Sequence, residues 1–383
     1  MSKTKNKNFY WIEYLRNVSS IQQLRENLAT YHRLLHFNSL REIVIVGTAE
    51  EGQRLWRLCN QWNIRVLFLC DDNPAKQGLT IDHYKIHSTD CLETIDKSTP
   101  IVIASHRVLK PTQRLRAKGF KTVIPFAVLQ VLYGDKFPPH MFYARWLEAL
   151  FENRDQLDTL IPLLEDYRSV EVLNRILGFR LTLNPEQLTS IIEWDLYGPG
   201  ELLHYSDHEI YIDGGAFDGD TINSFIHRMQ GKFKKIIGFE PDQRTFQSLQ
   251  SRFVSESRVE VVNKGLYSHT DTLYFDNIGT RASALISQEQ SNVVKVPVTS
   301  IDETLNGEPI TYIKMNIEGA EIPALQGATN SLAQYKPKLG ISVYHRPTDL
   351  WEIPLLIKRL NADYKFHLRQ HDGGVIESVL YAL

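Results

Sequence analysis

Apolar residues in this chain occur in short continuous runs, and the segments between the runs carry apolar residues at helical spacing. Continuous runs are typical of strands buried on both faces of a parallel sheet, and helical spacing is typical of amphipathic helices. The runs lie at residues 43–46, 65–70, 101–105 and 122–124, and again at residues 210–212, 236–239, 259–262, 310–316 and 338–344. The pattern therefore predicts an α/β fold with two separate parallel sheets.

Two stretches near the C-terminus instead predict antiparallel strands. Residues 271–298 show more alternation of apolar and polar positions, which is typical of strands with one exposed face. Residues 364–368 and 375–383 are two apolar stretches joined through Gly373 and Gly374, which indicates a closing hairpin. We expect the first pair to be an insertion and the second pair to complete the larger sheet.

The remaining segments predict helices. Residues 9–37 carry apolar residues at helical intervals without Gly or Pro. Residues 128–203 carry many large apolar side chains and lack the Gly/Ser-rich composition of a flexible linker. The predicted organisation is a helical segment (1–40), a small Rossmann-like domain (41–127), a helical connector (128–203) and a larger α/β domain (204–383).

Composition narrows the class of protein. The chain has 383 residues, of which 43% are hydrophobic and 23% charged, and these are globular values. A net charge of −2 gives no electrostatic reason to expect nucleic acid as a partner. Three cysteines without C-x-x-C spacing indicate buried thiols in a reducing compartment. The polar N-terminus and the lack of a long apolar run predict a cytoplasmic protein without a membrane span; a homo-oligomer remains possible.

A glycine-rich turn follows the first strand of the larger domain. The sequence Asp213-Gly-Gly-Ala-Phe-Asp-Gly-Asp-Thr221 leads into a segment with helical spacing, and the next apolar run ends at Glu240. Glycine lets a backbone approach a ligand closely, and an acid after the next strand can accept hydrogen bonds from ribose hydroxyls. The spacing differs from the dinucleotide fingerprint and is closer to the glycine loop of class I methyltransferases. The alternative is a tight turn without a ligand.

The smaller domain has a related but incomplete pattern. Gly47 and Gly52 follow its first strand and Asp71 ends its second, but Ala49 replaces the middle glycine of the G-x-G-x-x-G fingerprint. This domain is therefore either a nucleotide-binding unit or a scaffold. An NAD-dependent oxidoreductase unit is a third interpretation, which the broken fingerprint disfavours.

Five ordered motifs resemble those of FkbM-type methyltransferases. They lie at residues 211–221, 238–241, 298–302, 312–321 and 343–347, so the resemblance covers residues 204–383 strongly. The resemblance implies a class I methyltransferase fold, S-adenosylmethionine as cofactor, and O-methylation of a hydroxyl on a sugar, glycan or natural product. One position departs from the family pattern, because Asn316 stands where the family usually has Asp.

The expected cofactor site lies at the carboxyl ends of the strands, where ligands bind in open α/β sheets. The glycine loop and the following helix N-terminus should hold the methionine part, Glu240 the ribose, and the segment from Asn263 to Leu266 the adenine. The expected cofactor-binding residues are Asp213, Gly214, Gly215, Ala216, Phe217, Gly219, Asp220, Thr221, Glu240, Pro241, Asn263, Lys264, Gly265 and Leu266.

The expected catalytic residues are His345, Asn316, Glu318 and Lys314. His345 follows the fifth core strand and has an ordinary pKa near neutrality, so we expect it to be the general base that deprotonates the acceptor. The alternative is a histidine that only supports structure. The pairs His83/His87 and His367/His371 lack further ligands at standard spacing, so no metal site is predicted.

The sequence therefore predicts an S-adenosylmethionine-dependent O-methyltransferase that acts on a small-molecule or carbohydrate acceptor. The alternative is a binding or scaffold protein with a methyltransferase fold and no turnover, which Asn316 and the additional N-terminal domain suggest.

Overall fold

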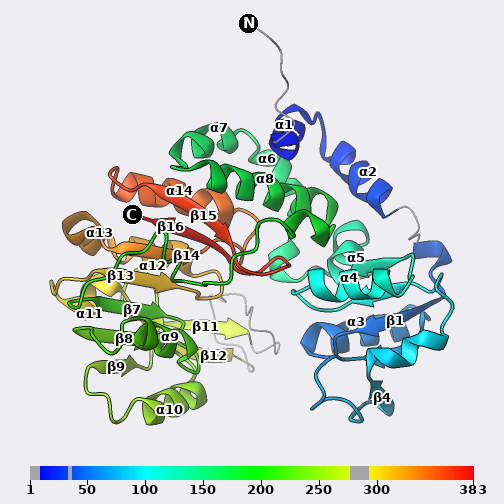
Figure 1. Cartoon of the computed structure of the whole chain (residues 1–383), viewed down its shortest axis with the longest axis horizontal. Coiled ribbons are helices and arrows are strands. Elements are labelled where there is room, and N and C mark those ends of the chain that lie inside the picture. The colour runs from blue at the N-terminus through cyan, green and yellow to red at the C-terminus, as the bar shows by residue number, and fades with distance from the viewer. Residues whose placement is uncertain (1–8, 33–36, 277–292) are drawn as a thin grey trace, which may run out of the picture.

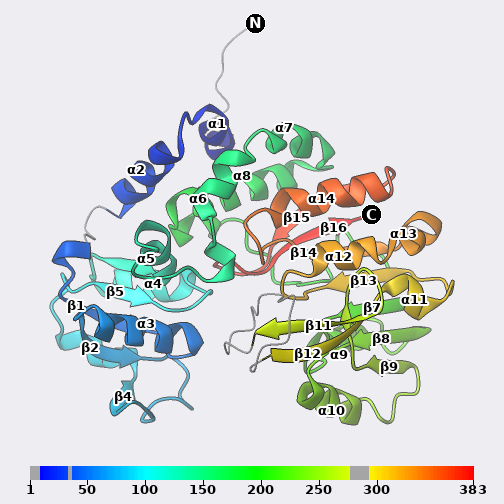
Figure 2. The same ribbon diagram turned by 180° about the vertical axis from the view of Figure 1, so that it is seen from behind.

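The computed structural model describes residues 9–32, 37–276 and 293–383. It contains two α/β units, whose sheets lie side by side, and a group of helices that lies along the same edge of both (Figure 1). The view from behind shows the same arrangement and places the C-terminal strand inside the second unit (Figure 2).

The N-terminal sheet has six strands in the order β3-β4-β2-β1-β5-β6, and β2 and β1 lie in its middle. All neighbouring pairs are parallel except β3 and β4. The apolar run of β1 is buried because both neighbours and the helices cover it. The elements are β1 (Glu42–Val46), α3 (Glu50–Gln61), β2 (Arg65–Cys70), β3 (Thr80–Ile81), β4 (Tyr84–His87), β5 (Ile101–Ile103), α4 (Leu109–Ala117), β6 (Val123–Pro125) and α5 (Phe126–Leu132).

The C-terminal sheet has seven strands in the order β15-β16-β14-β13-β7-β8-β9. The five strands from β14 to β9 in this order are parallel, and β16 pairs antiparallel with both β14 and β15, as the hairpin prediction required. The predicted fold class is confirmed. The elements are β7 (Ile210–Gly214), α9 (Asp220–Arg228), β8 (Lys235–Phe239), α10 (Gln243–Arg252), β9 (Val259–Val262), α11 (Ile301–Leu305), β13 (Tyr312–Met315), α12 (Glu321–Gln326), α13 (Thr329–Tyr335), β14 (Lys338–Ser342), α14 (Asp349–Leu360), β15 (Phe366–Gln370) and β16 (Ser378–Ala382).

A small additional sheet confirms the predicted insertion. β10 (Gly265–Leu266), β12 (Val293–Thr299) and β11 (Asp271–Asp276) form three strands, and β11 pairs antiparallel with β12 from Asp271 opposite Val298. The middle of the predicted stretch, residues 277–292, lies outside the described residues.

The N-terminal helical segment is divided into two helices. α1 (Tyr10–Asn17) ends before Val18, and the Ser20 hydroxyl accepts a hydrogen bond from Gln23 N and so begins α2 (Ile21–Tyr31). An N-capping serine begins a new helix because it satisfies a free N–H group of the first turn. The prediction of one helical stretch over residues 9–37 is therefore refined, and residues 33–36 lie outside the described residues.

The connector holds the N-terminal helices against the rest of the molecule. Its helices are α6 (Trp146–Glu152), α7 (Gln156–Leu160) and α8 (Tyr167–Thr182). Asn174 of α8 accepts hydrogen bonds from Trp11 N and Ile12 N of α1. Asp166, before α8, pairs with Arg369 of β15 at 2.8 Å. The connector is thus packed against both ends of the chain.

Among the described residues, no helix is both long and apolar enough to cross a membrane.

The two α/β units contact each other through a turn of the C-terminal hairpin. Val108 N and Leu109 N donate to Gly373 O, and Arg107 Nε lies 2.7 Å from Asp372 Oδ2. A Cβ on Gly374 would lie 1.6 Å from His106 O, so this contact requires glycine. The segment that follows strand β5 of the first unit is therefore in contact with the second unit.

Candidate active site

The glycine turn after β7 adopts backbone conformations that favour glycine. Gly215 and Gly219 have φ values of +72° and +85°, and a Cβ on Gly215 would lie 2.1 Å from Asn316 O. Phe217 also has a positive φ, of +47°, and its side chain is 49% exposed. Left-handed backbone is unfavourable for a bulky residue and tends to occur at functional sites. The turn is thus held tightly against the neighbouring strand β13, with Phe217 projecting outward.

A buried ion pair supports this turn from below. Lys314 and Asp213 face each other across the parallel pair β13–β7, and both are at most 2% exposed. Lys314 Nζ donates to Asp213 Oδ1 at 2.8 Å, to Gly214 O at 3.1 Å and to Gly215 O at 3.0 Å. Thr221 Oγ1 donates to the other oxygen of Asp213. A lysine ammonium has three protons, and all three are used here.

This arrangement changes the expected roles of two residues. Lys314 was expected to be catalytic, but it has no proton left for a substrate and is buried, so it positions the glycine loop. Asp213 was expected to bind the cofactor, but both of its oxygens are occupied by Lys314 and Thr221. It therefore supports the loop from inside the domain and does not present its carboxylate to a ligand.

Glu240 lies at the neighbouring strand end, directly after β8. Its Oε2 accepts from Phe217 N at 3.0 Å and its Oε1 accepts from Asp242 N at 2.8 Å. Burial raises the pKa of Glu240, and the two backbone hydrogen bonds oppose that rise. A carboxylate has about four lone-pair positions, so Glu240 retains acceptor capacity for ligand hydroxyls.

The segment expected beside adenine lies next to Glu240. Asn263 Nδ2 donates to the backbone oxygens of Glu240 and Pro241 at 2.9 and 3.2 Å. Leu266 is buried, and a Cβ on Gly214 would lie 2.8 Å from its Cδ1. The structure thus brings the glycine loop, Glu240 and residues 263–266 to one edge of the sheet, and a nucleoside site there stays a prediction.

The other side of the same edge carries Asn316 and Tyr344. Asn316 Oδ1 accepts a hydrogen bond from Tyr344 OH at 3.0 Å, and Asn316 N donates to Gly214 O at 3.1 Å. Glu318 follows with a φ of +55° and a side chain that is 41% exposed. Asn316 is therefore anchored by its side chain, while Glu318 is accessible at the turn that follows.

His345 is not placed as a base would need to be. It is 0% exposed, and its Nδ1 lies 3.0 Å from Glu321 Oε1. Burial lowers the pKa of His345, but the Glu321 carboxylate and neighbouring acids outweigh it and raise this pKa to about 9. A general base must be deprotonated and within hydrogen-bond reach of the acceptor proton. Burial and the raised pKa therefore disfavour His345 as the base, and its role stays a prediction.

Residues 213–368 match the family model of the methyltransferase FkbM domain. These residues belong to the FkbM methyltransferase family. A crystal structure of methyltransferase FkbM from Methylobacillus flagellatus KT matches 99% of this chain and 98% of its own, with 25% sequence identity and a TM-score of 0.73. The match therefore includes the N-terminal unit and the connector as well as the FkbM domain.

More distant structures match only part of the chain. An rRNA methylase from Streptococcus thermophilus has 16% identity and a TM-score of 0.29, and covers 48% of this chain and 88% of its own. SMU.1697c from Streptococcus mutans, in complex with SAH, has 12% identity and a TM-score of 0.29, with 52% and 96% covered. Likeness at this level carries no argument about function. Comparison with curated proteins found no significant match.

Two residues near this site, Glu377 and Arg107, were not predicted from the sequence. Glu377 has a φ of +64°, its side chain is largely buried, and its Oε2 has no hydrogen-bond partner among the described residues. Burial raises its pKa. Arg107, from the N-terminal unit, places NH2 3.8 Å from Glu377 Oε1. The Gly373-Gly374 pair indicated a hairpin, but no sequence signal showed that its turn would meet the other unit.

In the N-terminal unit, the acid at the end of β2, Asp71, accepts hydrogen bonds from residues of the same unit. Asp71 Oδ2 accepts from Thr48 N at 2.8 Å, Thr48 Oγ1 at 2.6 Å and Lys76 Nζ at 3.2 Å, and its Oδ1 accepts from Asn73 N at 2.9 Å. A Cβ on Gly47 would lie 2.7 Å from Ala104 O, so close packing within the chain explains this glycine.

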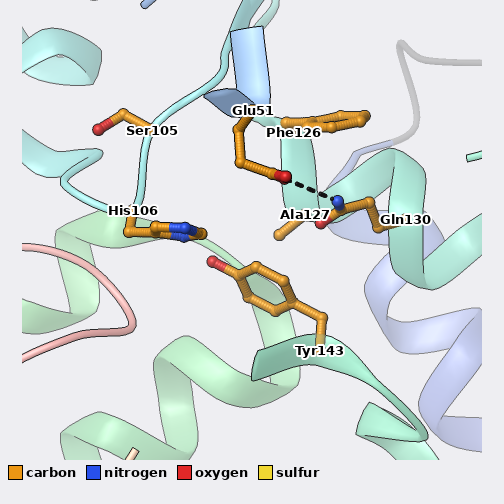
Figure 3. Close-up of a pocket in the computed structure, with 7 residues that line it drawn as sticks. All are labelled: Glu51, Ser105, His106, Phe126, Ala127, Gln130 and Tyr143. Carbon is orange, nitrogen blue, oxygen red and sulfur yellow. Dashed lines mark hydrogen bonds between the residues drawn. The ribbon is translucent and has the colours of Figure 1, made fainter. Parts of the chain in front are cut away.

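A small cavity lies beyond the strand ends of this unit. Its volume is about 10 Å³, which is room for about one water molecule. Figure 3 shows Gln130 Nε2 donating to Glu51 Oε2, at 3.0 Å, beside His106 and Tyr143. These contacts favour the scaffold interpretation over nucleotide binding. The lining residues are Glu51, Ser105, His106, Phe126, Ala127, Gln130 and Tyr143.

The histidine pairs considered for metal binding have other surroundings. His367 Nδ1 lies 2.8 Å from Asp166 Oδ2. His371 is hydrogen-bonded to Glu193 O at 2.8 Å and to Tyr381 OH at 2.9 Å. His87 packs edge-on against the Phe68 ring. Each therefore has a structural environment of its own.

Proposed function

We propose that this protein transfers the methyl group of S-adenosylmethionine to a hydroxyl oxygen of a sugar, glycan or natural product. The observation that carries the proposal is the glycine loop, which is fixed on the Lys314–Asp213 pair and faces Glu240 at the same sheet edge. The FkbM domain supports methyl transfer as the reaction class. The hydroxyl acceptor is the finer part of the proposal, and it rests on the family resemblance.

The residues present fit the cofactor chemically. A side chain at Gly215 would clash with the backbone of Asn316, so this glycine lets the loop pack closely against β13. The first N–H groups of α9 already bind carboxylates of the chain, because Asp220 N donates to Asp218 Oδ1 at 3.2 Å and Thr221 N donates to Asp220 Oδ1 at 2.7 Å. The free lone pairs of Glu240 suit ribose hydroxyls, and residues 263–266 adjoin that position.

The cofactor supplies an activated methyl group, so the protein has to position the acceptor and accept its proton. We assign acceptor binding to Glu318, Asn316 and Tyr344, which line the second half of the same edge. Glu377 is the group best suited to take the proton, because burial raises its pKa above the usual 4.5 and one oxygen lacks a partner among the described residues. Arg107 then orients Glu377 from the N-terminal unit.

Isothermal titration calorimetry with S-adenosylmethionine and with its demethylated product tests the cofactor. We expect one binding site per chain and weakened binding in Glu240→Ala. No binding by the folded wild-type protein would remove the proposal. Undiminished binding by the variant would show that the cofactor lies elsewhere.

A screen of glycosides and hydroxylated natural products with labelled cofactor tests the acceptor. Product formed by wild type and lost in Glu377→Gln, with cofactor affinity retained, supports the assigned proton acceptor. Equal turnover in Glu377→Gln would exclude that role.

A second candidate function is cofactor binding without methyl transfer. It is motivated by Asn316, whose uncharged side chain is occupied by the Tyr344 hydroxyl. Cofactor binding without transfer to any hydroxyl acceptor in the screen would favour it, and any methylated product would exclude it.

A further inference from the structure

Three potential metal ligands meet inside the C-terminal domain. Glu321 is the first residue of α12, Asp349 is the first residue of α14, and His345 lies in the turn between β14 and α14. One ligand atom of each lies within 4.8 Å of the ligand atoms of the other two. All three side chains are buried, with at most 2% exposed. No other such group of three occurs in the ranges 9–32, 37–276 and 293–383.

The polar atoms of this cluster are not satisfied by the protein. Neither ring nitrogen of His345 makes a hydrogen bond to a described residue, and neither does Glu321 Oε2. His345 Nδ1 is only 3.0 Å from Glu321 Oε1, so the pair is close in distance but poorly directed. Buried polar atoms without partners are uncommon and costly. Their presence in a histidine and a neighbouring carboxylate indicates a missing partner.

The carboxylates are nevertheless oriented by backbone groups. Glu321 Oε1 accepts from Ile317 N at 2.8 Å, and Asp349 Oδ2 accepts from Arg346 N at 2.6 Å. Hydrogen bonds of this kind fix the direction of metal-ligating carboxylates in known sites. One oxygen of each carboxylate is thereby held in place, while the second oxygen can contact a ligand.

We propose that Glu321, His345 and Asp349 bind a divalent transition-metal cation. One imidazole and two carboxylates form a mixed nitrogen and oxygen ligand set, which suits Zn²⁺ or Mn²⁺ and is less suited to Mg²⁺, for which oxygen ligands and water are preferred. A cation would supply the partner that His345 and Glu321 lack.

The cation would connect three segments that border the acceptor side. Glu321 closes the turn that carries Asn316 and Glu318, and His345 follows Tyr344. Because the cluster is buried, we assign the cation a structural role that fixes this turn and the start of α14. No step of methyl transfer is assigned to it.

Metal binding can be measured without an acceptor or a cofactor. The full chain is treated with chelator and dialysed, and Zn²⁺, Mn²⁺ and Mg²⁺ are titrated by calorimetry, with metal content checked by mass spectrometry. We expect one Zn²⁺ or Mn²⁺ per chain, weaker binding of Mg²⁺, and a higher Tm in the loaded protein. If the folded wild type binds none of the three cations, the proposal is wrong.

Shape-conserving variants locate the site. Glu321→Gln and Asp349→Asn should each weaken cation binding more than about tenfold, which is the least that loss of even an outer partner costs. The matched control is His371→Ala, because His371 is also buried but has partners for both ring nitrogens. It should bind the cation as wild type does. Wild-type affinity in both Glu321→Gln and Asp349→Asn would overturn the proposal, whatever the outcome of the cofactor titration.

Discussion

The N-terminal and C-terminal sheets both place a glycine-containing turn after a central strand and an acid after the next strand. In the N-terminal sheet, β1 leads into Gly47 and β2 into Asp71; in the C-terminal sheet, β7 leads into Gly215 and β8 into Glu240. The two acids differ in their partners. Asp71 accepts four hydrogen bonds, two from Thr48 in the turn after β1 and two from Asn73 and Lys76 in its own loop, whereas Glu240 accepts two, both from backbone N–H groups.

The glycine turns of the two sheets also differ in what surrounds them. The C-terminal turn is fixed from below by the buried Lys314–Asp213 pair, while Phe217 of the same turn is exposed. In the N-terminal unit, the segment that follows the neighbouring strand β5 is in contact with the Gly373-Gly374 turn of the other unit. A shared strand–turn–helix–strand–acid pattern therefore does not establish a shared function, because the availability of the acid depends on what already binds it.

Removing the buried lysine should have the largest effect on this comparison. Lys314→Met leaves the Asp213 carboxylate buried without its cation, and we expect unfolding to become easier by about 3–5 kcal/mol. Denaturant unfolding followed by circular dichroism measures this. The control is Lys235→Met in β8, whose partly exposed pair with Glu260 should contribute at most about 1 kcal/mol. Equal losses in both variants would contradict the proposed support of the glycine turn.

Neutralising Glu240 and Asp71 one at a time should show which of the two sheets binds the cofactor. Glu240→Gln should weaken S-adenosylmethionine binding about ten- to hundredfold, because hydrogen bonds to a charged acceptor are lost. Asp71→Asn should leave cofactor affinity unchanged and lower only the stability, because Asp71 binds its own loop. Calorimetry on both variants measures the difference. A similar loss of affinity in both would show that the N-terminal unit also takes part in cofactor binding.

The pH dependence of cofactor affinity and of stability should also distinguish Glu240 from Asp71. Burial raises the pKa of Glu240 above its usual 4.5, so folding disfavours its charged form. This cost is absent at low pH, grows as the pH rises from the unfolded pKa to the folded pKa, and is fully present above the folded pKa. Ribose hydroxyls need the carboxylate, so cofactor affinity should fall as the pH drops toward that raised pKa. Affinity measured in Glu240→Gln should show no such fall, and a parallel fall in this variant would assign it to another group.

The pKa of Asp71 is shifted in the opposite direction, so its effect on stability should have the opposite sign. Burial raises the pKa of Asp71, but the hydrogen bonds from Thr48, Asn73 and Lys76 outweigh it, and the net shift is downward. A lowered pKa contributes stability above the unfolded value that is lost as the pH falls through the folded value. Acid unfolding of wild type and Asp71→Asn should therefore converge only below the usual pKa of 3.8. Convergence already near neutral pH would contradict this.

The smallest effect is expected on turnover, from a substitution of Asn316 at the end of β13. Asn316→Asp retains an acceptor for the Tyr344 hydroxyl, so turnover should change by less than the about tenfold that a lost charged hydrogen bond costs. Steady-state kinetics with an acceptor found in the screen measure this. A large gain in turnover would mean that the natural chain is an attenuated enzyme.

Local patterns were sufficient for much of this protein. Buried parallel strands require continuous apolar runs, and a turn that meets a neighbouring backbone requires glycine, so both sheets, the β15–β16 hairpin and the edge that carries Gly215 and Glu240 were predictable from residue type and spacing. The FkbM motifs lie on these elements for the same reason. The domain boundaries at residues 40, 127 and 203 stay predictions.

Only the tertiary structure decided what the polar side chains contact. Lys314 meets Asp213 because of the register between β13 and β7, and a shift of one residue would turn its side chain to the other face. His345 follows a strand as predicted, but the packing of α12 and α14 places it in the interior beside Glu321. Arg107 reaches Glu377 only because two distant units pack together. Such contacts depend on long-range geometry, which the spacing of residues along the chain does not specify.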